Sequence, residues 1–149
     1  MRRASVTIGT VAMLLLLCGG LGTSRAQPAV RLFDLTTAHG IDGDKPFLPT
    51  RVFASDDDVV YLWYAAEGCA VGTTITSTWW YMETDPPFRL AVGEVTVAHE
   101  GNWGQFNFRL AEGRRWPIGR YRIELSVGGI TIADVTFDIT ARATVDHAG

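Results

Sequence analysis

The chain has 149 residues, of which 47% are hydrophobic, and a formal net charge of −3. This length is enough for one globular domain with a sizeable apolar core, and the mildly acidic charge disfavours nucleic-acid partners, which attract basic surfaces. The two cysteines are too few for a fold held together by several disulfides, so packing must supply the stability.

The first 26 residues have the three parts of a secretory signal peptide. Two arginines supply a positive start, Val11–Leu17 form a short apolar centre, and Ser24 and Ala26 are small residues placed for cleavage. Glycines interrupt the apolar run, which falls short of the roughly 20 apolar residues that a membrane-spanning helix needs. The sequence therefore predicts cleavage after Ala26 and a secreted or periplasmic mature protein that begins at Gln27.

Two other export routes stay open. The run Leu15-Leu16-Leu17-Cys18 resembles a bacterial lipoprotein box, which would attach a lipid to Cys18 and place the protein on a membrane. Such boxes have a small residue where Leu17 stands, so this route is disfavoured. The arginine pair is shared with twin-arginine signals, but the residues that follow it are not those that usually accompany such a pair.

Cleavage after Ala26 removes three arginines and no acidic residue, so the formal charge shifts from −3 to −6. The mature chain keeps one cysteine, Cys69, which lies between Gly68 and Ala70 with no histidine or lysine beside it in sequence to activate it. We expect a reduced, non-catalytic thiol. The alternative is a disulfide between two chains, which an odd cysteine in an exported protein permits.

From Gln27 onward, alternating or apolar runs recur with turn residues between them, which is typical of the strands of an all-β domain. Turns are expected at Gly40–Pro46, at Asp85–Pro87 and at His99–Gly104, and the acidic run Asp56–Asp58 also separates two strands. The strands expected between them are, in chain order, 30–35, a short edge segment 51–53, 59–64, 73–82, 92–97 and 106–110.

The strongest strand pattern lies near the C-terminus. Apolar and polar residues alternate over 121–127, Gly128-Gly129 can adopt the positive φ values of a two-residue hairpin turn, and a second alternating run continues to Ile139. No stretch of the mature chain has a convincing helical period. The sequence predicts a single antiparallel β-sandwich of about seven strands over 27–140, followed by a polar tail at 141–149.

The motif Pro117-x-Gly119-x-Tyr121 precedes this hairpin, which finishes with Val135-x-Phe137-x-Ile139, and Trp79 lies in a strand at mid-chain. This arrangement resembles the immunoglobulin-like and fibronectin-type-III-like sandwich domains of exported bacterial proteins, over roughly Val30–Ile139. The resemblance implies that Tyr121 is a tyrosine corner, bonded through its hydroxyl to upstream backbone, and that Trp79 is the core tryptophan. It implies no single function, because this fold hosts many.

Neither a metal nor another cofactor is expected. His39, His99 and His147 have no cysteine or second histidine at metal-ligand spacing. Asp42-Gly43-Asp44 begins like a calcium loop, but Pro46 and Phe53 occupy later ligand positions. Asp56–Asp58 could hold a hard cation with help from another loop, although such a run is more often a solvated turn.

No catalytic residue is predicted either, because the chain has no nucleophile, phosphate-binding or dinucleotide motif. The alternative is a small hydrolase on a sandwich scaffold, which would use loop carboxylates with His39 or His99. The hypothesis that the sequence favours is an exported, non-catalytic binding or structural module that acts through protein–protein contacts, with an unknown protein partner.

Tryptophans are the candidate contact residues. Trp79 and Trp80 are consecutive and must point to opposite faces of a regular strand, while Trp103 lies between glycines in an expected turn. We therefore predict that Trp80 or Trp103 belongs to a partner surface. The alternatives are that Trp80 is covered by the Asp85–Phe88 loop, or that Trp80 and Trp103 join Trp116 in a carbohydrate-binding module.

Overall fold

The computed structural model describes residues 29–142. The predicted signal peptide 1–26, its cleavage site after Ala26, the alternative lipid attachment at Cys18 and the tail beyond residue 142 lie outside the described residues. Tests of those predictions therefore have to come from solution experiments.

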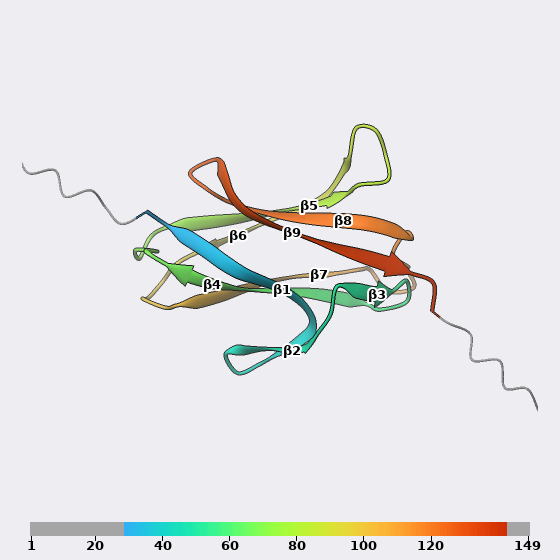
Figure 1. Ribbon diagram of the computed structural model, residues 1–149, viewed down its shortest axis with the longest axis horizontal. Coiled ribbons are helices and arrows are strands. Elements are labelled where there is room, and N and C mark those ends of the chain that lie inside the picture. Colours follow the sequence, from blue (N-terminus) through green and yellow to red (C-terminus); the bar gives the residue numbers. More distant parts are fainter. Residues whose placement is uncertain (1–28, 143–149) are drawn as a thin grey trace, which may run out of the picture.

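Two layers of β-sheet face each other across an apolar core (Figure 1). One sheet has four strands in the order β2-β1-β4-β7, and the other has five in the order β3-β9-β8-β5-β6. No helix within residues 29–142 is long and apolar enough to span a membrane. The strands are β1 (Arg31–Asp42), β2 (Lys45–Pro49), β3 (Val52–Ala54), β4 (Val59–Glu67), β5 (Thr74–Tyr81), β6 (Phe88–Thr96), β7 (Trp103–Arg109), β8 (Gly119–Val127) and β9 (Ile130–Thr140).

The N-terminal strands connect the two layers. β1 pairs with β4 in the four-stranded sheet, and the chain then passes through the β2 hairpin to β3, which joins the other sheet beside β9. The β3–β9 pair is parallel, whereas the other pairs are antiparallel. The prediction of an antiparallel sandwich thus holds except at this edge.

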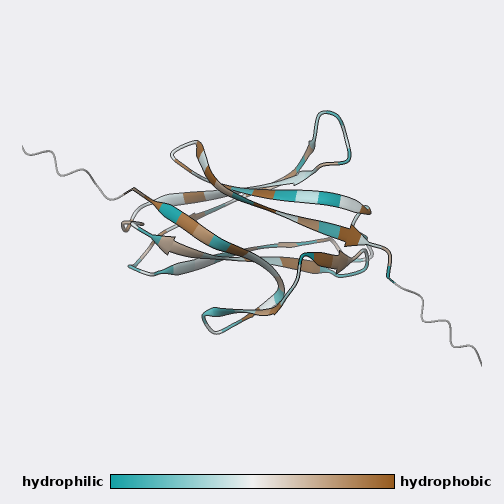
Figure 2. Ribbon diagram, in the orientation of Figure 1, coloured by the Kyte–Doolittle hydropathy of each residue, from teal (hydrophilic) through white to brown (hydrophobic). Residues whose placement is uncertain are grey.

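The core follows from the period-two pattern of the strands (Figure 2). Tyr121, Ile123 and Leu125 of β8 are buried, and they lie with Trp79 of β5 in one cluster of buried residues from both sheets. Full burial of an apolar side chain stabilises a fold by roughly 1.5–3 kcal/mol. The closing hairpin turns at Gly128 and Gly129, whose φ values of 59° and 79° fit the turn that the sequence predicts.

Nine strands are present among the described residues, so the expectation of about seven was too low. The segment expected as a loop, Gly40–Pro46, is instead the end of β1, a turn at Gly43 and the start of β2. Pro46 and Pro49 hid this strand in the sequence. Both are tolerated because β2 is an edge strand, where a missing N–H donor need not break a ladder.

A second correction concerns the expected turn His99–Gly104. Trp103 and Gly104 are the first two residues of β7, where they pair with Ala65 and Tyr64 of β4. The flanking glycines suggested a turn, but Gly104 is needed for packing inside the strand, as described below.

Candidate functional site

The outer face of the four-stranded sheet carries a groove between aromatic side chains. Phe33 of β1 is the cross-strand neighbour of Ala65 in β4, and Ala65 is the neighbour of Trp103 in β7. Because Ala65 ends at Cβ, the two rings flank a hollow between strands that are two spacings, about 10 Å, apart. We call this hollow, of about 380 Å³, the aromatic groove.

Trp63 adds a third ring to the aromatic groove, one position along β4 on the same face. Its indole Nε1–H donates a hydrogen bond of 2.9 Å to the carbonyl oxygen of Asp44 in the β1–β2 turn. Lys45 and Pro46 of that hairpin also line the groove. The hairpin that the sequence pattern missed is therefore what builds one wall of the site.

The rim of the aromatic groove is polar. Arg31 lies over the Phe33 ring, 5.1 Å from its centre, and donates a 2.9 Å hydrogen bond to Glu67. Both charged side chains are exposed, so the pair contributes at most about 1 kcal/mol to stability. Its effect is to hold charge beside an apolar floor, which is the composition of many recognition sites.

Trp80, the other predicted contact residue, lies on the opposite side of the molecule, on the outer face of the five-stranded sheet. It is half-buried, and its Nε1–H donates to Glu124 at 3.1 Å. The second oxygen of Glu124 accepts from Arg122 at 2.7 Å. The Nε of Arg122 is enclosed and, within residues 29–142, has no hydrogen-bond partner.

The three tryptophans of the carbohydrate hypothesis do not share a surface. Trp116 is in the core, only 2% exposed, and its Nε1–H donates to the carbonyl oxygen of Asp57 at 2.7 Å. Trp80 and Trp103 lie on different sheets. These three tryptophans therefore cannot form one sugar-binding surface. Trp103 instead lines the aromatic groove with Trp63 and Phe33.

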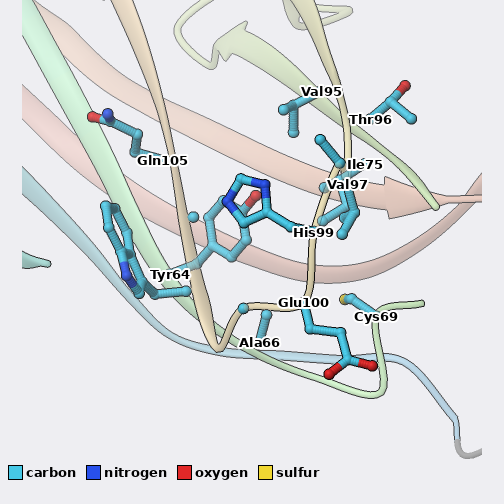
Figure 3. A pocket seen from close by; sticks show the side chains of 14 residues that line it. Tyr64, Ala66, Cys69, Ile75, Val95, Thr96, Val97, His99, Glu100 and Gln105 are labelled. Carbon is cyan, nitrogen blue, oxygen red and sulfur yellow. The ribbon is translucent and has the colours of Figure 1, made fainter. Parts of the chain in front are cut away.

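A second hollow, of about 560 Å³, opens between the two sheets at the edge where β6 passes to β7 (Figure 3). We call it the interlayer pocket. It is lined by apolar side chains from both sheets and by polar ones, namely Tyr64, Cys69, Thr96, His99, Glu100 and Gln105. Burial, with a smaller contribution from Cys69, raises the pKa of Tyr64 to about 12, and burial also raises the pKa of the Cys69 thiol.

The histidines that the hydrolase hypothesis invoked lie in separate places. The Nδ1 of His39 is 4.0 Å from Asp57 Oδ2, and its ring packs against Phe53. That same oxygen accepts the backbone N–H of Ala54 at 2.8 Å, so Asp57 has a structural role in its turn. His99 is in the interlayer pocket, among residues from β4 to β7.

The acidic run after β3 is matched by arginines. Asp56 and Asp57 lie 3.0 and 3.7 Å from Arg142, and Asp58 pairs with Arg109. Within residues 29–142, no three histidine, cysteine or acidic side chains gather where they could share a metal ion. These ion pairs give the run a structural explanation, since each carboxylate already has a cation close by.

The two residues to which the resemblance gave structural roles lie in the core. The Tyr121 hydroxyl donates to the carbonyl oxygen of Pro117 at 2.6 Å, which is the contact expected of a tyrosine corner. Trp79 is 2% exposed and packs against Phe108 and Phe137 from the two sheets. Both side chains therefore join the two sheets or their turns through core contacts.

Sequence reasoning missed Phe33, Trp63 and Tyr64 as site residues. The residues of 59–64 are apolar or aromatic throughout, so the sequence does not show which face is outward, but Trp63 alternates with buried Leu62 and Tyr64 and faces outward. That outward tryptophan was the one signal that could have pointed to this face.

No protein-family model matches the chain, and no curated protein sequence does either. Among solved structures, the P. fluorescens alkylpurine DNA glycosylase AlkC bound to abasic-site DNA matches with a TM-score of 0.45 and 15% identity, over 75% of this chain and 30% of that one; such a score supports no argument. An immunoglobulin-like protein from Pseudomonas aeruginosa matches with a TM-score of 0.55 and 17% identity, over 77% of this chain and 99% of that one. Residues 29–142 therefore have an immunoglobulin-like β-sandwich fold.

Proposed function

We propose that this chain is an exported, non-catalytic binding module that holds a protein partner in the aromatic groove. The observation that carries the proposal is that Phe33, Ala65 and Trp103 are cross-strand neighbours on three adjacent strands. Two half-buried aromatic rings therefore lie on either side of a small residue. Aromatic side chains that surround a pocket of this kind are the commonest sources of binding energy in protein interfaces.

The place of the groove in the sheet supports a protein partner. Trp103 opens β7, which is the edge strand of the four-stranded sheet. An edge strand presents backbone N–H and C=O groups to which an extended segment can add. A partner segment laid beside β7 would therefore gain backbone hydrogen bonds and place a side chain against Trp103.

The chemistry of the remaining polar residues supports a role without catalysis. Burial raises the pKa of Cys69, which disfavours the thiolate that a cysteine nucleophile requires. His39 and His99 lie apart, and the carboxylate nearest His39 is engaged by a backbone N–H. Export rests on the n-region, apolar centre and cleavage site of residues 1–26.

A glycan is the second candidate ligand. The aromatic groove has a volume of about 380 Å³ and polar groups at its rim, and sugar rings stack on aromatic faces of this kind. A glycan array probed with the mature protein separates the two. Binding that is lost in Trp103→Ala and Trp63→Ala would favour the glycan.

The protein proposal is tested by site-specific photo-crosslinking in the exporting cell. A photo-reactive phenylalanine analogue at Asn107, which is exposed on the groove side of β7, should crosslink to one discrete protein. The same analogue at Thr76, on the outer face of the five-stranded sheet, is the control. Trp103→Ala should abolish the Asn107 crosslink, whereas Trp80→Ala should not.

Two results would contradict this assignment. A crosslink at Thr76 that requires Trp80 would move the partner surface to the five-stranded sheet, which is the other surface that the sequence predicts. No crosslink at either position, together with a glycan signal that depends on Trp103, would favour the glycan over the protein partner.

A further inference from the structure

The interlayer pocket has a polar anchor at its wall that the fold itself does not use. Tyr64 is only 2% exposed and lines the pocket, and within residues 29–142 its hydroxyl is not among the buried atoms that lack a partner, so this group is accessible from the pocket. By contrast, the hydroxyls of Tyr81 and Tyr121 donate hydrogen bonds to backbone carbonyl oxygens. A hydroxyl that borders an apolar pocket in this way can donate a hydrogen bond to an accepting group of a bound molecule.

Gly104 shows how the phenol comes to lie there. Gly104 is the cross-strand neighbour of Tyr64, and a Cβ built on it would collide with the Tyr64 hydroxyl and the end of its ring. The missing side chain allows the phenol to cross β7 toward the open edge between the sheets. The ring is held there by stacking on Phe106, with centroids 6.0 Å apart.

The walls of the pocket define what would fit beside that hydroxyl. Its volume of about 560 Å³ lies within the range of small-molecule sites, about 300–1,000 Å³. Ile75 and Val95 come from the five-stranded sheet, Ala66 from the four-stranded sheet, and Val97 from the connecting loop. Figure 3 shows His99 and Tyr64 among the side chains that line this space.

The charged side chains of the pocket lining indicate which class of ligand it can hold. The lining contains Glu100 but no lysine or arginine, so an anionic ligand would meet repulsion without a compensating cation. The raised pKa of Tyr64, about 12, keeps the phenol protonated and a hydrogen-bond donor at neutral pH. The site is thus suited to a neutral molecule with an accepting oxygen.

We infer that the interlayer pocket is a binding site for a small, neutral, mostly apolar molecule whose carbonyl or ether oxygen accepts the hydrogen bond of the Tyr64 hydroxyl. This site is distinct from the aromatic groove, although Ala66 and Trp103 line both. The inference therefore stands whether the partner in the groove is a protein or a glycan.

Two probes of nearly equal shape test the inference. Acetophenone has an aromatic ring and one carbonyl oxygen, and ethylbenzene has a methylene in place of that carbonyl. Each is titrated into the isotope-labelled mature protein, and amide shifts are followed by NMR. We expect acetophenone to shift the signals of residues 95–100, which line the interlayer pocket but not the aromatic groove, and to bind more tightly than ethylbenzene.

Tyr64→Phe supplies the decisive comparison, because it removes the hydroxyl and keeps the ring. Acetophenone affinity should fall about fivefold, the equivalent of one neutral hydrogen bond, while ethylbenzene affinity should stay within about twofold. Tyr81→Phe, which loses a hydroxyl remote from the pocket lining, should leave both affinities unchanged.

The inference is overturned if neither probe shifts residues 95–100, because the pocket then binds no molecule of this class. It is also overturned if Tyr64→Phe weakens both probes equally, because the hydroxyl would then act only through the structure. Shifts confined to the aromatic groove would show that the apolar ring prefers Trp63 and Trp103.

Discussion

The hydroxyl of Tyr121 donates a hydrogen bond of 2.6 Å to the carbonyl oxygen of Pro117, four residues earlier in the chain. The Tyr121 ring also stacks on Phe137 of β9, with centroids 5.1 Å apart and planes at 12°. One side chain thus fixes the turn before β8 to the core between the sheets. Burial, with a smaller effect of Tyr81, raises the pKa of Tyr121, so the hydroxyl remains a donor over the physiological range.

Replacement of Tyr121 by phenylalanine should destabilise the domain by about 1–3 kcal/mol, since it leaves the Pro117 carbonyl without its partner. Urea unfolding followed by tryptophan fluorescence measures the change. Tyr81→Phe is the matched control, because the Tyr81 hydroxyl donates to the neighbouring Ile118 carbonyl in a more exposed setting, and should cost less. Equal midpoints for wild type and Tyr121→Phe would show that the corner is not a stability element.

Gly104→Ala should destabilise the domain by about 1–3 kcal/mol through overpacking against Tyr64. Gly101→Ala provides the control, because its Cβ would meet open space and its backbone has no positive φ. Thermal unfolding of both variants reports the difference. A Gly104→Ala variant as stable as Gly101→Ala would mean that Tyr64 can move aside at little cost.

The stability of the domain should fall as the pH rises from 10 toward 12. The pKa of Tyr64 is about 12 in the folded chain and about 10 when unfolded, so the unfolded state ionises first and is favoured by alkali. Tyr64→Phe should lower the slope of stability against pH by up to about 1.4 kcal/mol per pH unit. Urea melts at pH 9, 10 and 11 measure both slopes, and identical slopes would contradict the shift.

Cys69 should be a reduced thiol that reacts slowly with iodoacetamide at pH 8, because burial raises its pKa and lowers its thiolate fraction. Alkylation followed by mass spectrometry compares its rate with that of free cysteine. Non-reducing electrophoresis tests the alternative. A dimer that disappears on reduction would establish a disulfide between chains.

Intact-mass analysis of the exported protein should find a mature chain that begins at Gln27, as the small residues Ser24 and Ala26 predict. The sample comes from cell-envelope and culture fractions. The mass of a lipid-modified chain that begins at Cys18 would instead indicate membrane anchoring. The mass of the uncleaved chain would contradict both cleavage after Ala26 and lipid attachment at Cys18.

Local sequence patterns were sufficient to predict those strands and turns that depend only on nearby residues. The closing hairpin was predictable because alternation over 121–127 indicates a strand and the pair Gly128-Gly129 indicates a two-residue turn, although a bulge at Leu125/Ser126 shifts the register between them. β2 was not, because Pro46 and Pro49 resemble loop residues until the strand is known to be an edge. Trp103 was assigned to a turn for a similar reason. Glycines are typical of turns, but Gly104 lies within β7, where its missing side chain leaves room for Tyr64.

The aromatic groove depended on information that no local window contains. Phe33, Ala65 and Trp103 come from three strands, and only their cross-strand register makes them neighbours. A shift of one residue in any pairing would move these side chains to the other face. The irregularity in β1 between Phe33 and Thr36 is such a shift in register, and the sequence carries no clear mark of it.

The parallel pairing of β3 with β9 has a mechanical consequence. β1 begins at one end of the molecule and β9 ends at the other (Figure 1), and a force that draws β3 against β9 acts along the length of both parallel strands. The backbone hydrogen bonds between them are then loaded together, in shear, and do not open one at a time like a zipper. This edge of the five-stranded sheet should therefore resist a force along its strands better than an edge whose bonds open in turn.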